Sequence, residues 1–435
     1  MTFFLTFLFM FMVFWRPQEW LWPWMFGWPV LDVIAGAAML SLFFEVNQGQ
    51  LRIPKQAPQV FLILGLFFAA LVSHVPHTYF GGILLAIPPM FKLCGFTLLL
   101  ICVLDRPIRL RRVAWLFVVM ACLMAIHALL QKTRGYGFAD ARPIAVRRPG
   151  IPFYTRSLFF GIFGDPNDLA QILATSIPFA FALTWRRSIF GFLLGCGVTW
   201  LLVAAILATH SRGGMVALAT VACTMVILLF PPRWLPVLLI VLLAGVFFVL
   251  PMASGQMDAS ARDRVVFWGD ANRAFKENPL FGLGYRMFWQ VSDDRTAHNA
   301  FVLCYTEIGF FGYWFWFCLV QLGMVGAWRT RTLLRREASA EGSWLRRFTG
   351  LTMAATMGFV ASAYFLSRAF VFPLFFLLAL LAALPVVAER FLPEGHPPIF
   401  RLGRDVYLWG TLGAAGSVAY IYVSILILNR VWAGG

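Results

Sequence analysis

The residues best suited to chemistry in this chain are basic, and several of them lie in one polar stretch between apolar runs. Arg262, Arg264 and His298 belong to this stretch, and His298 stands just before the apolar residues that follow Asn299. A histidine at the end of a polar loop, where a membrane helix begins, indicates a reaction site on a membrane surface. A lone histidine is also a common structural hydrogen-bonding residue, and the stretch by itself leaves both interpretations open.

A second candidate is the turn 209–214, which reads THSRGG. Arg212 lies at the predicted edge of the membrane, and the two glycines that follow it allow a backbone or a ligand to approach closely. An arginine at this depth can also extend its charged end to the interface without binding any ligand, so two interpretations of Arg212 stay open.

Two motifs with proline and glycine predict the local structure around these residues. The segment Gly164-Asp-Pro-Asn-Asp-Leu-Ala170 predicts the start of a helix. Pro166 suits the first turn of a helix, and Asp165 or Asn167 can cap its exposed N–H groups. The segment Asn278-Pro-Leu-Phe-Gly-Leu-Gly284 predicts a turn of the chain.

The first part of the polar stretch predicts an amphipathic helix over 261–276 that lies on the membrane surface. In such a helix Arg264, Trp268 and either Ala271 or Asn272 share one face, because residues three or four positions apart are neighbours on a helix surface.

The composition sets the class of protein. Of the 435 residues, 61% are hydrophobic and 12% are charged, whereas a soluble domain has about 25% charged residues. Continuous apolar runs of about 15–25 residues predict membrane-spanning helices rather than the alternating strands of a barrel. The predicted fold class is therefore an all-α polytopic membrane protein, with residues 1–435 in one integral membrane domain. The seven cysteines lie in apolar runs and are predicted to be packing residues.

The apolar runs predict about 13 membrane spans, or about 12 if the first is a half-span. The run 2–15 lacks the basic region and cleavage site of a signal peptide, so it is predicted to be a helix. The loops 106–112 and 329–347 are strongly basic and are predicted to be cytoplasmic, which places 132–157 and 254–299 in the periplasm. The predicted spans are 2–15, 24–45, 58–74, 83–104, 113–131, 158–185, 189–208, 215–231, 234–253, 300–328, 348–366, 369–388 and 406–428.

The two predicted periplasmic loops are basic and so oppose the positive-inside rule. The net charge of +16 would suggest nucleic acid in a soluble protein, but cytoplasmic loops account for part of it here, and no nucleic-acid partner is predicted. The arginines on the outer face are predicted to bind an anion. The alternative is that long loops cross the membrane largely regardless of their charge.

The order of five motifs resembles the O-antigen ligase superfamily, which includes lipid A–core:surface polymer ligases, related O-antigen polymerases and protein O-oligosaccharyltransferases. The motifs are Gly164–Ala170, Ser211–Gly214, Arg264–Trp268, Asn278–Gly284 and His298–Gly312, and the resemblance covers roughly 80–390. It implies an all-helical, GT-C-like membrane glycosyltransferase with a large periplasmic loop. It also implies an undecaprenyl-diphosphate-linked glycan as donor and an active site that faces the periplasm from the bacterial inner membrane.

The resemblance implies roles for individual residues. The essential arginine of the family's short outer turn falls on Arg212, the arginine four residues before an aromatic side chain falls on Arg264, and the histidine falls on His298. Arg262 replaces Arg264 if the register shifts by two. Arg368 resembles another arginine found late in some ligases.

Two parts of the chain depart from the family's pattern. The segment 284–298 is shorter than its counterpart in several ligases, and the apolar run 406–428 lies beyond the resemblance. Both departures bear on acceptor choice or topology.

The implied reaction gives these residues a chemical task. Departure of a lipid diphosphate develops negative charge, which the guanidinium groups of Arg212 and Arg264 would stabilise, and His298 would act as base toward the acceptor hydroxyl. Near the loops the only adjacent acidic pair, Asp293-Asp294, does not suit a divalent metal, so neither a metal nor another cofactor is predicted. The residues predicted to contribute to substrate binding are Arg262, Arg147, Arg148, Arg368 and Asn299.

The favoured function is an O-antigen ligase that transfers the glycan to a hydroxyl of the lipid A–core oligosaccharide with inversion at the anomeric carbon. Its predicted partners are the lipid-linked donor, the lipid A–core acceptor and membrane lipid. An O-antigen polymerase and a protein O-oligosaccharyltransferase stay open as alternatives. A lipid-linked glycan transporter is an alternative from another class, and it would place its charges inside a membrane cavity rather than at one face.

Overall fold

The computed structural model describes residues 1–54, 57–148, 151–184, 188–229, 259–292 and 296–432. It is 78% helix and 2% strand. Within this described part, nine helices are long and apolar enough to cross a membrane. The prediction of an all-α polytopic membrane protein is confirmed. The nine candidate spans are Val30–Asn47, Gln59–His77, Phe80–Val103, Pro107–Arg134, Ile189–Ala208, Arg212–Leu229, Ala300–Arg336, Phe372–Phe391 and Leu402–Arg430.

Four of the predicted spans are not among these nine. The first, 2–15, is the short apolar helix α1 (Thr2–Trp15). The runs 158–185 and 348–366 fall on helices α7 (Pro166–Thr184) and α13 (Ala340–Ala363), which carry several polar or charged residues. The run 234–253 lies outside the residues that the structure describes.

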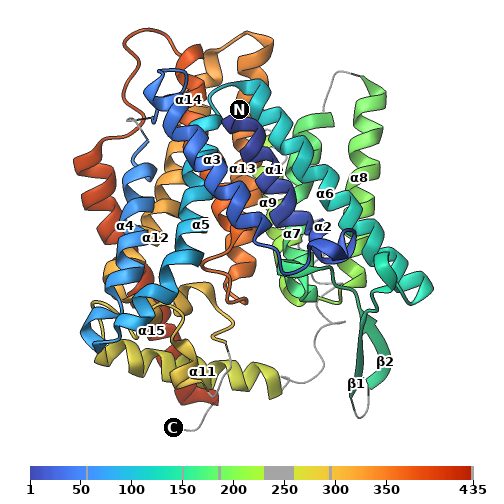
Figure 1. Cartoon of the computed structure of the whole chain (residues 1–435), viewed down its shortest axis with the longest axis vertical. Helices are drawn as coiled ribbons and strands as arrows, with labels where there is room; N and C mark the ends of the chain where they lie inside the picture. The colour runs from blue at the N-terminus through green and yellow to red at the C-terminus, as the bar shows by residue number, and fades with distance from the viewer. Residues whose placement is uncertain (55–56, 149–150, 185–187, 230–258, 293–295, 433–435) are drawn as a thin grey trace. The chain divides into compact units, whose positions relative to one another are not determined.

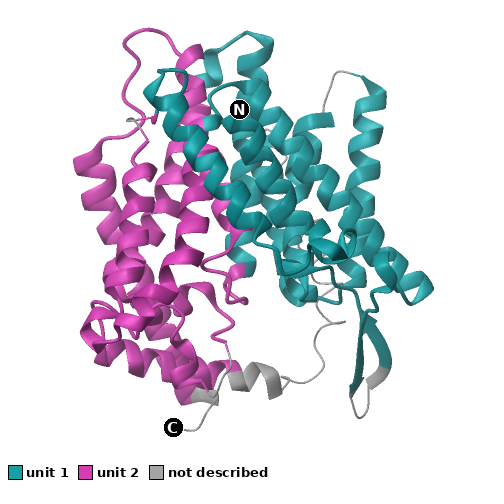
Figure 2. Ribbon diagram, in the orientation of Figure 1, with its two compact units in different colours: residues 1–52, 103–244, 334–362 teal, residues 53–102, 245–333, 363–435 magenta. Residues whose placement is uncertain are grey.

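The chain divides into two compact units, which are described separately (Figure 2). The first unit comprises Met1–Arg52, Val103–Ala244 and Leu334–Ser362, and the second comprises Ile53–Cys102, Gly245–Leu333 and Ala363–Gly435. Each unit therefore gathers segments that are far apart in the sequence.

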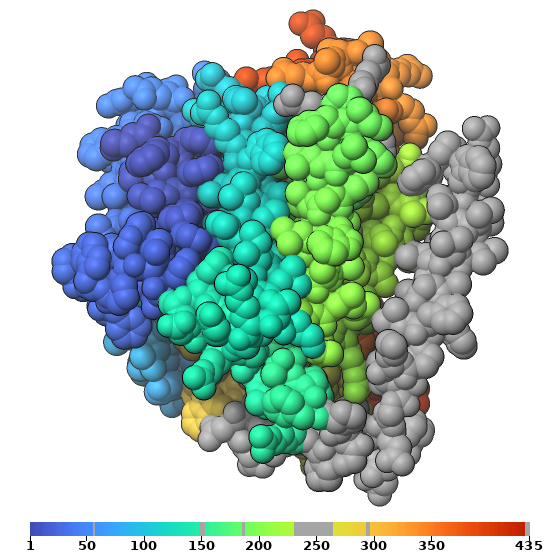
Figure 3. Space-filling view, turned by 90° about the vertical axis from the view of Figure 1, so that its right-hand side faces the viewer, coloured from blue at the N-terminus to red at the C-terminus, as the bar shows by residue number. Residues whose placement is uncertain are grey.

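Helix α7 is the central helix of the first unit. It contacts α6 (Pro107–Arg134), α8 (Ile189–Ala208) and α9 (Arg212–Leu229), and almost all of its residues are buried (Figure 1). On the surface of this unit, α6 and α8 lie side by side (Figure 3). The exposed side chains of α8 are mostly large and apolar, among them Phe190 and Trp200, which is the pattern expected of a helix that faces lipid.

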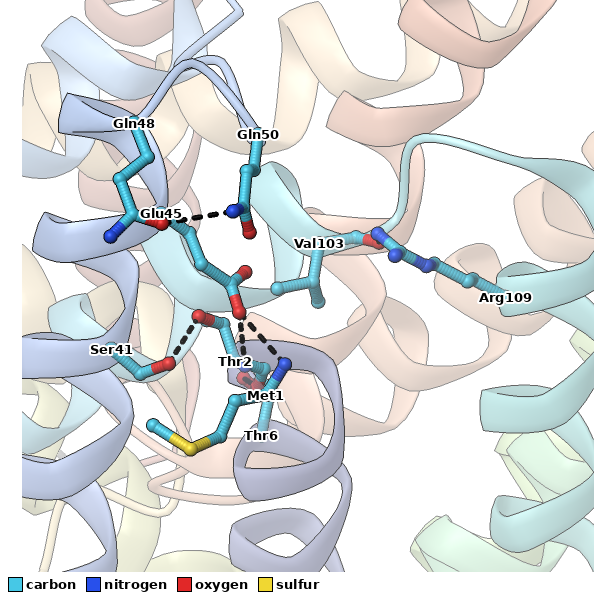
Figure 4. Close-up of polar contacts among 9 residues, drawn as sticks. All are labelled: Met1, Thr2, Thr6, Ser41, Glu45, Gln48, Gln50, Val103 and Arg109. Carbon is cyan, nitrogen blue, oxygen red and sulfur yellow. Dashed lines mark hydrogen bonds and ion pairs between the residues drawn. The ribbon is translucent and has the colours of Figure 1, made fainter.

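Helices α1 and α3 (Val30–Asn47) form a pair in the first unit. The hydroxyl groups of Thr2 and Ser41 lie 2.7 Å apart, and the Thr2 N–H donates to the Glu45 carboxylate at 3.1 Å (Figure 4). Polar contacts at one end thus fix two otherwise apolar helices against each other.

A β-hairpin follows α6, which continues to Arg134 and so takes the first residues of the predicted loop 132–157. Strands β1 (Ile144–Arg148) and β2 (Ile151–Arg156) are antiparallel, with Ile144 paired to Arg156 at the base. This hairpin was not predicted from the sequence. Its position matters because the last residue of β2 lies next to the start of α7 and the turn between α8 and α9.

Helix α12 (Ala300–Leu333) is the central helix of the second unit and contacts α4, α11, α14 and α15. It is broken at Gly309, whose φ of 63° and ψ of −173° are not helical. The other helices of this unit are α4 (Gln59–Val72), α5 (Phe80–Val103), α11 (Ala259–Glu277), α14 (Phe372–Ala388) and α15 (Thr411–Trp432). The short elements in the described part of the chain are α2 (Pro17–Trp20), the 3-10 turns Pro23–Met25, Val75–His77, Phe138–Asp140, Gly161–Phe163, Phe288–Val291, Leu334–Arg336 and Glu389–Phe391, and the π-helix Leu402–Gly410.

Candidate active site

The first unit contains a polar cluster at the start of α7, which we call the Arg156 cluster (Arg156, Asn167, Thr209, Ser211 and Arg212). The Asn167 Oδ1 accepts hydrogen bonds from Arg156 Nη2 at 3.0 Å and from Ser211 Oγ at 2.7 Å. Arg156 Nε also donates to the Thr209 carbonyl at 3.0 Å. These bonds join the end of β2, the first turn of α7 and the turn between α8 and α9 into one rigid corner.

Arg212 is the first residue of α9, and its side chain is exposed. The Ser211 hydroxyl accepts from the Gly214 N–H at 3.0 Å and so caps this helix. A helix N-terminus carries partial positive charge, and a cation there opposes the helix dipole. The exposed guanidinium and the helix end therefore add their positive potentials at one place, which suits the binding of an anion.

Gly214 and Ala170 explain why two of the motifs contain small residues. A Cβ at position 214 would overlap the Cβ of Ala170, so α9 approaches α7 closely only with glycine there. The start of α7 agrees with the prediction, because Pro166 is its first residue and the Asp165 carboxylate accepts from the Asn167 N–H at 2.7 Å.

His210 lies in the same corner, in the left-handed conformation with a φ of 48°. Its ring packs on the ring of Tyr154 at 5.0 Å between centroids. Burial lowers the pKa of His210, and the positive charges of Lys132 and Arg156 lower it further. A neutral imidazole at neutral pH is the consequence.

Two further arginines of the β-hairpin, Arg147 and Arg148, lie in β1. Arg147 is exposed, and its guanidinium lies 5.6 Å from the centroid of the Phe153 ring. Arg148 pairs with Ile151 through the backbone, and its side chain lies outside what the structure describes. Their predicted part in substrate binding stays a prediction.

The second unit holds His298 in a segment anchored on both sides, which we call the His298 segment (296–299). The His298 N–H donates to Ser367 Oγ at 2.7 Å, and the Ala297 carbonyl accepts from Trp268 Nε1 at 2.6 Å. His298 has a φ of 49°, so the chain turns sharply just before α12. Its side chain is half-buried. The backbone of the histidine is therefore fixed while part of its surface stays accessible.

Helix α11 carries Arg264 and Trp268 one turn apart, so they share a face, as predicted. Through Trp268 this face is tied to the His298 segment. The Trp268 ring also packs edge-on against Tyr364 at 6.2 Å. Arg262 belongs to α11 as well, but its side chain lies outside the described residues.

Asn299 and Arg368 flank the His298 segment. The Asn299 side chain is fully buried, and its Oδ1 accepts from the N–H groups of Phe301 and Val302 at 2.9 and 3.2 Å, which caps α12. This role is structural, and it is sufficient to explain an asparagine at this position. Arg368 is half-buried and directly follows Ser367, the residue that binds the His298 backbone.

The segment Asn278–Gly284 fills the break in α12. The N–H groups of Leu283 and Gly284 donate to the carbonyls of Thr306 and Glu307, each at 2.9 Å. In the reverse direction, Phe310 and Phe311 donate to the carbonyls of Pro279 and Leu280 at 2.8 and 3.0 Å. A membrane helix must have its backbone groups satisfied internally, and this segment satisfies those that the break exposes.

Glycines make this close approach possible. A Cβ at Gly282 would lie 2.5 Å from the Gly309 nitrogen, and a Cβ at Gly309 would overlap the Leu280 carbonyl. The positive φ of Gly309 with an extended ψ is a conformation that other residues hardly adopt. The motifs Asn278–Gly284 and His298–Gly312 are thus two halves of one structural feature.

The structure distributes the predicted site residues over the two units. Arg212 lies in the first unit with Arg147 and Arg148, whereas Arg264, His298, Asn299 and Arg368 lie on connected segments of the second unit. Sequence reasoning missed Arg156. The available signal was its place at the end of a basic loop, directly before an apolar run.

These features define a multi-pass helical membrane protein in which Arg212 begins a helix, Arg264 lies within the amphipathic helix α11, and His298 precedes α12. Residues 197–317 match the family model described as O-Antigen ligase. This match confirms the resemblance to the O-antigen ligase superfamily that the motifs predicted. The matched residues include Arg212, Arg264 and His298. A comparison with curated proteins found no match.

The match supports a function of the O-antigen ligase or polymerase type, in a family of glycosyltransferase-like enzymes. Such a family acts in general on lipid-linked glycans, with polysaccharide or lipid acceptors. Together with the nine apolar helices found among the described residues, it indicates a multi-pass membrane protein.

Proposed function

We propose that this chain is an O-antigen ligase that transfers a glycan from undecaprenyl diphosphate to a hydroxyl of the lipid A–core oligosaccharide. The observation that carries the proposal is that Arg212, Arg264 and His298 all fall within the O-Antigen ligase match. Arg212 begins α9, Arg264 lies within α11, and His298 lies two residues before the start of α12. The reaction would take place on the periplasmic face of the bacterial inner membrane.

Arg212 and Arg264 are the proposed binding groups for the donor's diphosphate. When the bond between the anomeric carbon and the diphosphate oxygen breaks, its electron pair stays on that oxygen. Guanidinium groups stabilise the resulting charge with paired, permanently charged hydrogen bonds. Arg262, Arg147, Arg148, Arg368 and Asn299 are further candidates for binding donor or acceptor.

His298 is the proposed general base. The acceptor hydroxyl forms the new bond to the anomeric carbon and gives its proton to the imidazole. A histidine has the intrinsic pKa range for this task at neutral pH. Because the acceptor attacks opposite the leaving diphosphate, the product is inverted at the anomeric carbon. The fixed backbone of His298 supports this role, since a base must be held at a defined distance from the proton it takes.

The mechanism is proposed to be independent of metal, with arginines providing the electrostatic stabilisation. Transfer by the purified protein should therefore persist in an excess of chelator. A strict requirement for a divalent ion would contradict this part of the proposal.

The identity of the acceptor can be tested by the lipopolysaccharide profile of a strain that lacks this gene. Loss of a ligase leaves bare lipid A–core and accumulates lipid-linked polymer, whereas loss of a polymerase leaves core with a single repeat. An unchanged profile would contradict the ligase proposal and favour a protein acceptor or another glycan system.

Substitutions test the two arginines. Arg212→Ala and Arg264→Ala should each lower transfer by about 10²–10³, the usual effect of removing one group that stabilises transition-state charge. Arg134→Ala at the exposed end of α6 and Arg273→Ala on the exposed side of α11 are the matched controls. Equal activity of a site variant and its control would remove that arginine from the mechanism.

A further inference from the structure

Helix α15 lies beyond the residues matched by the family model, yet it packs against the helix that carries Arg264. One hydrogen bond between the two helices comes from Asn272 of α11, whose side chain is only 2% exposed. Its Nδ2 donates to the Tyr422 carbonyl of α15 at 3.1 Å, and its Oδ1 accepts from the Tyr305 hydroxyl of α12 at 2.7 Å. One buried amide thus joins three helices and uses both of its polar ends.

Asn272 belongs to the same face of α11 as the proposed site residue. Arg264, Trp268 and Asn272 follow one another at intervals of four residues, so they form one stripe along the helix. Trp268 holds the middle of the stripe to the His298 segment, and Asn272 holds its far end to α15 and α12. These two contacts define the position and rotation of α11, and with them the position of Arg264.

Gly269 permits the close approach of α11 and α15. A Cβ at this position would overlap the side-chain nitrogen of Asn429 in α15 and lie 3.1 Å from its Cγ. Glycine in the interior of a helix is unfavourable unless close packing requires it. Glycine is explained at this position because its lack of a side chain leaves room for Asn429.

Helix α15 is itself anchored to α12 independently of α11. The hydroxyl groups of Tyr313 and Ser417 lie 2.7 Å apart. Before α15, the π-helix Leu402–Gly410 is held by an ion pair in which Arg329 Nη2 donates to Asp405 Oδ1 at 2.9 Å. A helix fixed in this way can support another one.

We propose that α15, acting through Asn272, is a positioning element that holds α11 so that Arg264 meets the donor's diphosphate. This inference rests on the proposed function for the role of Arg264, and it assigns a task to a helix outside the family match. Asn272 is a positioning residue, since it acts through α11 rather than on the substrate.

The first test compares Asn272→Ala with Arg273→Ala, its neighbour on the exposed side of α11, whose side chain is 78% exposed. Asn272→Ala should lower kcat by about tenfold to a hundredfold with little change in the KM for the acceptor. The reason is that a displaced Arg264 slows the chemical step without affecting how the acceptor binds. Hydrogen exchange in 259–277 should become faster in this variant and not in Arg273→Ala. Tyr305→Phe, which removes one of the two bonds with little change in shape, should show a smaller effect of the same kind.

The second test restores the contact by another route. Gly269→Cys and Asn429→Cys together remove the amide that a Cβ at position 269 would overlap. Because that Cβ lies 3.1 Å from the Asn429 Cγ, the two new thiols are within reach of a disulfide. In the Asn272→Ala background, oxidation of this pair should restore most of the lost kcat and slow the exchange of 259–277, and reduction should reverse both effects.

The outcomes separate this inference from the proposed function. If Arg264→Ala is inactive while Asn272→Ala and Tyr305→Phe match wild type, the positioning role of α15 is wrong. The same conclusion follows if Asn272→Ala loses activity without faster exchange in α11. If instead Arg264→Ala keeps full activity, the proposed role of Arg264 fails, while the exchange and disulfide measurements still test the contact between α11 and α15.

Discussion

The Arg156 cluster and the His298 segment fix their residues in different ways. In the Arg156 cluster, side chains bind side chains, because Asn167 accepts from both Arg156 and Ser211. In the His298 segment each bond joins a side chain to a main-chain group. The Ala297 carbonyl accepts from Trp268, and the His298 N–H donates to Ser367. The first arrangement builds a rigid corner at the start of the helix that begins with Arg212, and the second fixes the backbone of His298. The two should therefore respond differently to substitution.

The largest effect is expected where a side chain is proposed to react directly with the substrate. His298→Ala should lower glycan transfer by about 10²–10⁴, the usual contribution of a general base. The unfolding temperature should stay close to that of wild type, because the backbone N–H that binds Ser367 remains. Full activity in this variant would show that the histidine is structural.

A backbone change should damage the second unit more than a side-chain change. Gly309→Ala forces a Cβ against the Leu280 carbonyl at a backbone conformation that only glycine favours. We expect the free energy of unfolding to fall by about 2–5 kcal/mol, from conformational strain and overpacking together. Thermal unfolding of the purified protein in detergent measures this change.

Gly416→Ala in α15 is the matched control for Gly309→Ala, since a Cβ there meets nothing within 4 Å. It should leave the unfolding temperature unchanged or raise it slightly. If Gly309→Ala lowers the unfolding temperature no more than Gly416→Ala does, the break in α12 is not required for stability.

The Arg156 cluster should be sensitive to the loss of one side-chain acceptor. Asn167→Ala removes the acceptor shared by the Arg156 guanidinium and the Ser211 hydroxyl. The free energy of unfolding should fall by about 1.5–3 kcal/mol, as for other hydrogen bonds to charged groups. Asn167→Asp keeps the acceptor and should retain most of the stability and activity. If both variants behave like wild type, the cluster does not hold the corner together.

The smallest effect concerns pH. The pKa of His210 is lowered in the folded state by burial and by the charges of Lys132 and Arg156. The folded protein therefore binds this proton less readily than the unfolded chain, and the stability contributed by the neutral form is lost as the pH falls through and below the ordinary histidine range. The unfolding temperature of wild type should fall more between pH 7.5 and 5.5 than that of His210→Gln.

His396 provides a control with the opposite sign for this measurement. Hydrogen bonds to Glu389 and to the Pro397 carbonyl raise its pKa. Its contribution is present at low pH and is lost as the pH rises through the folded-state pKa. His396→Gln should therefore lower the unfolding temperature at pH 5.5 rather than at pH 7.5. The same pH response in both variants would contradict the assignment of His210.

Much of the fold could be predicted from local sequence. Long apolar runs predicted the membrane helices, Pro166 predicted the start of α7, and the spacing of Arg264 and Trp268 predicted the shared face of α11. These predictions succeed because hydrophobicity, proline geometry and helical periodicity act over a few residues.

Contacts between distant segments could not be predicted in this way. Arg156 and Asn167 are joined to the turn at 209–211 only in the folded unit, and nothing local in the sequence indicates it. The run 300–328 is apolar except at a few positions such as Glu307, so periodicity gives no sign of the break at Gly309. A break is possible there because Asn278–Gly284 supplies the missing hydrogen bonds from outside the helix.

The hydrogen bonds between Asn278–Gly284 and the break in α12 determine where this chain can change its length. An insertion or deletion within Asn278–Gly284 would shift the four backbone bonds out of register and leave polar groups unpaired inside an apolar helix. The next residues are held as well, because the Tyr285 N–H donates to Ser73 Oγ at 2.9 Å and the Phe288 N–H donates to Glu307 Oε1 at 3.4 Å. Variation in the size of the extramembrane part is therefore expected to begin after Phe288, so that a loop can grow or shrink while Asn278–Gly284 stays bonded to the helix that follows it.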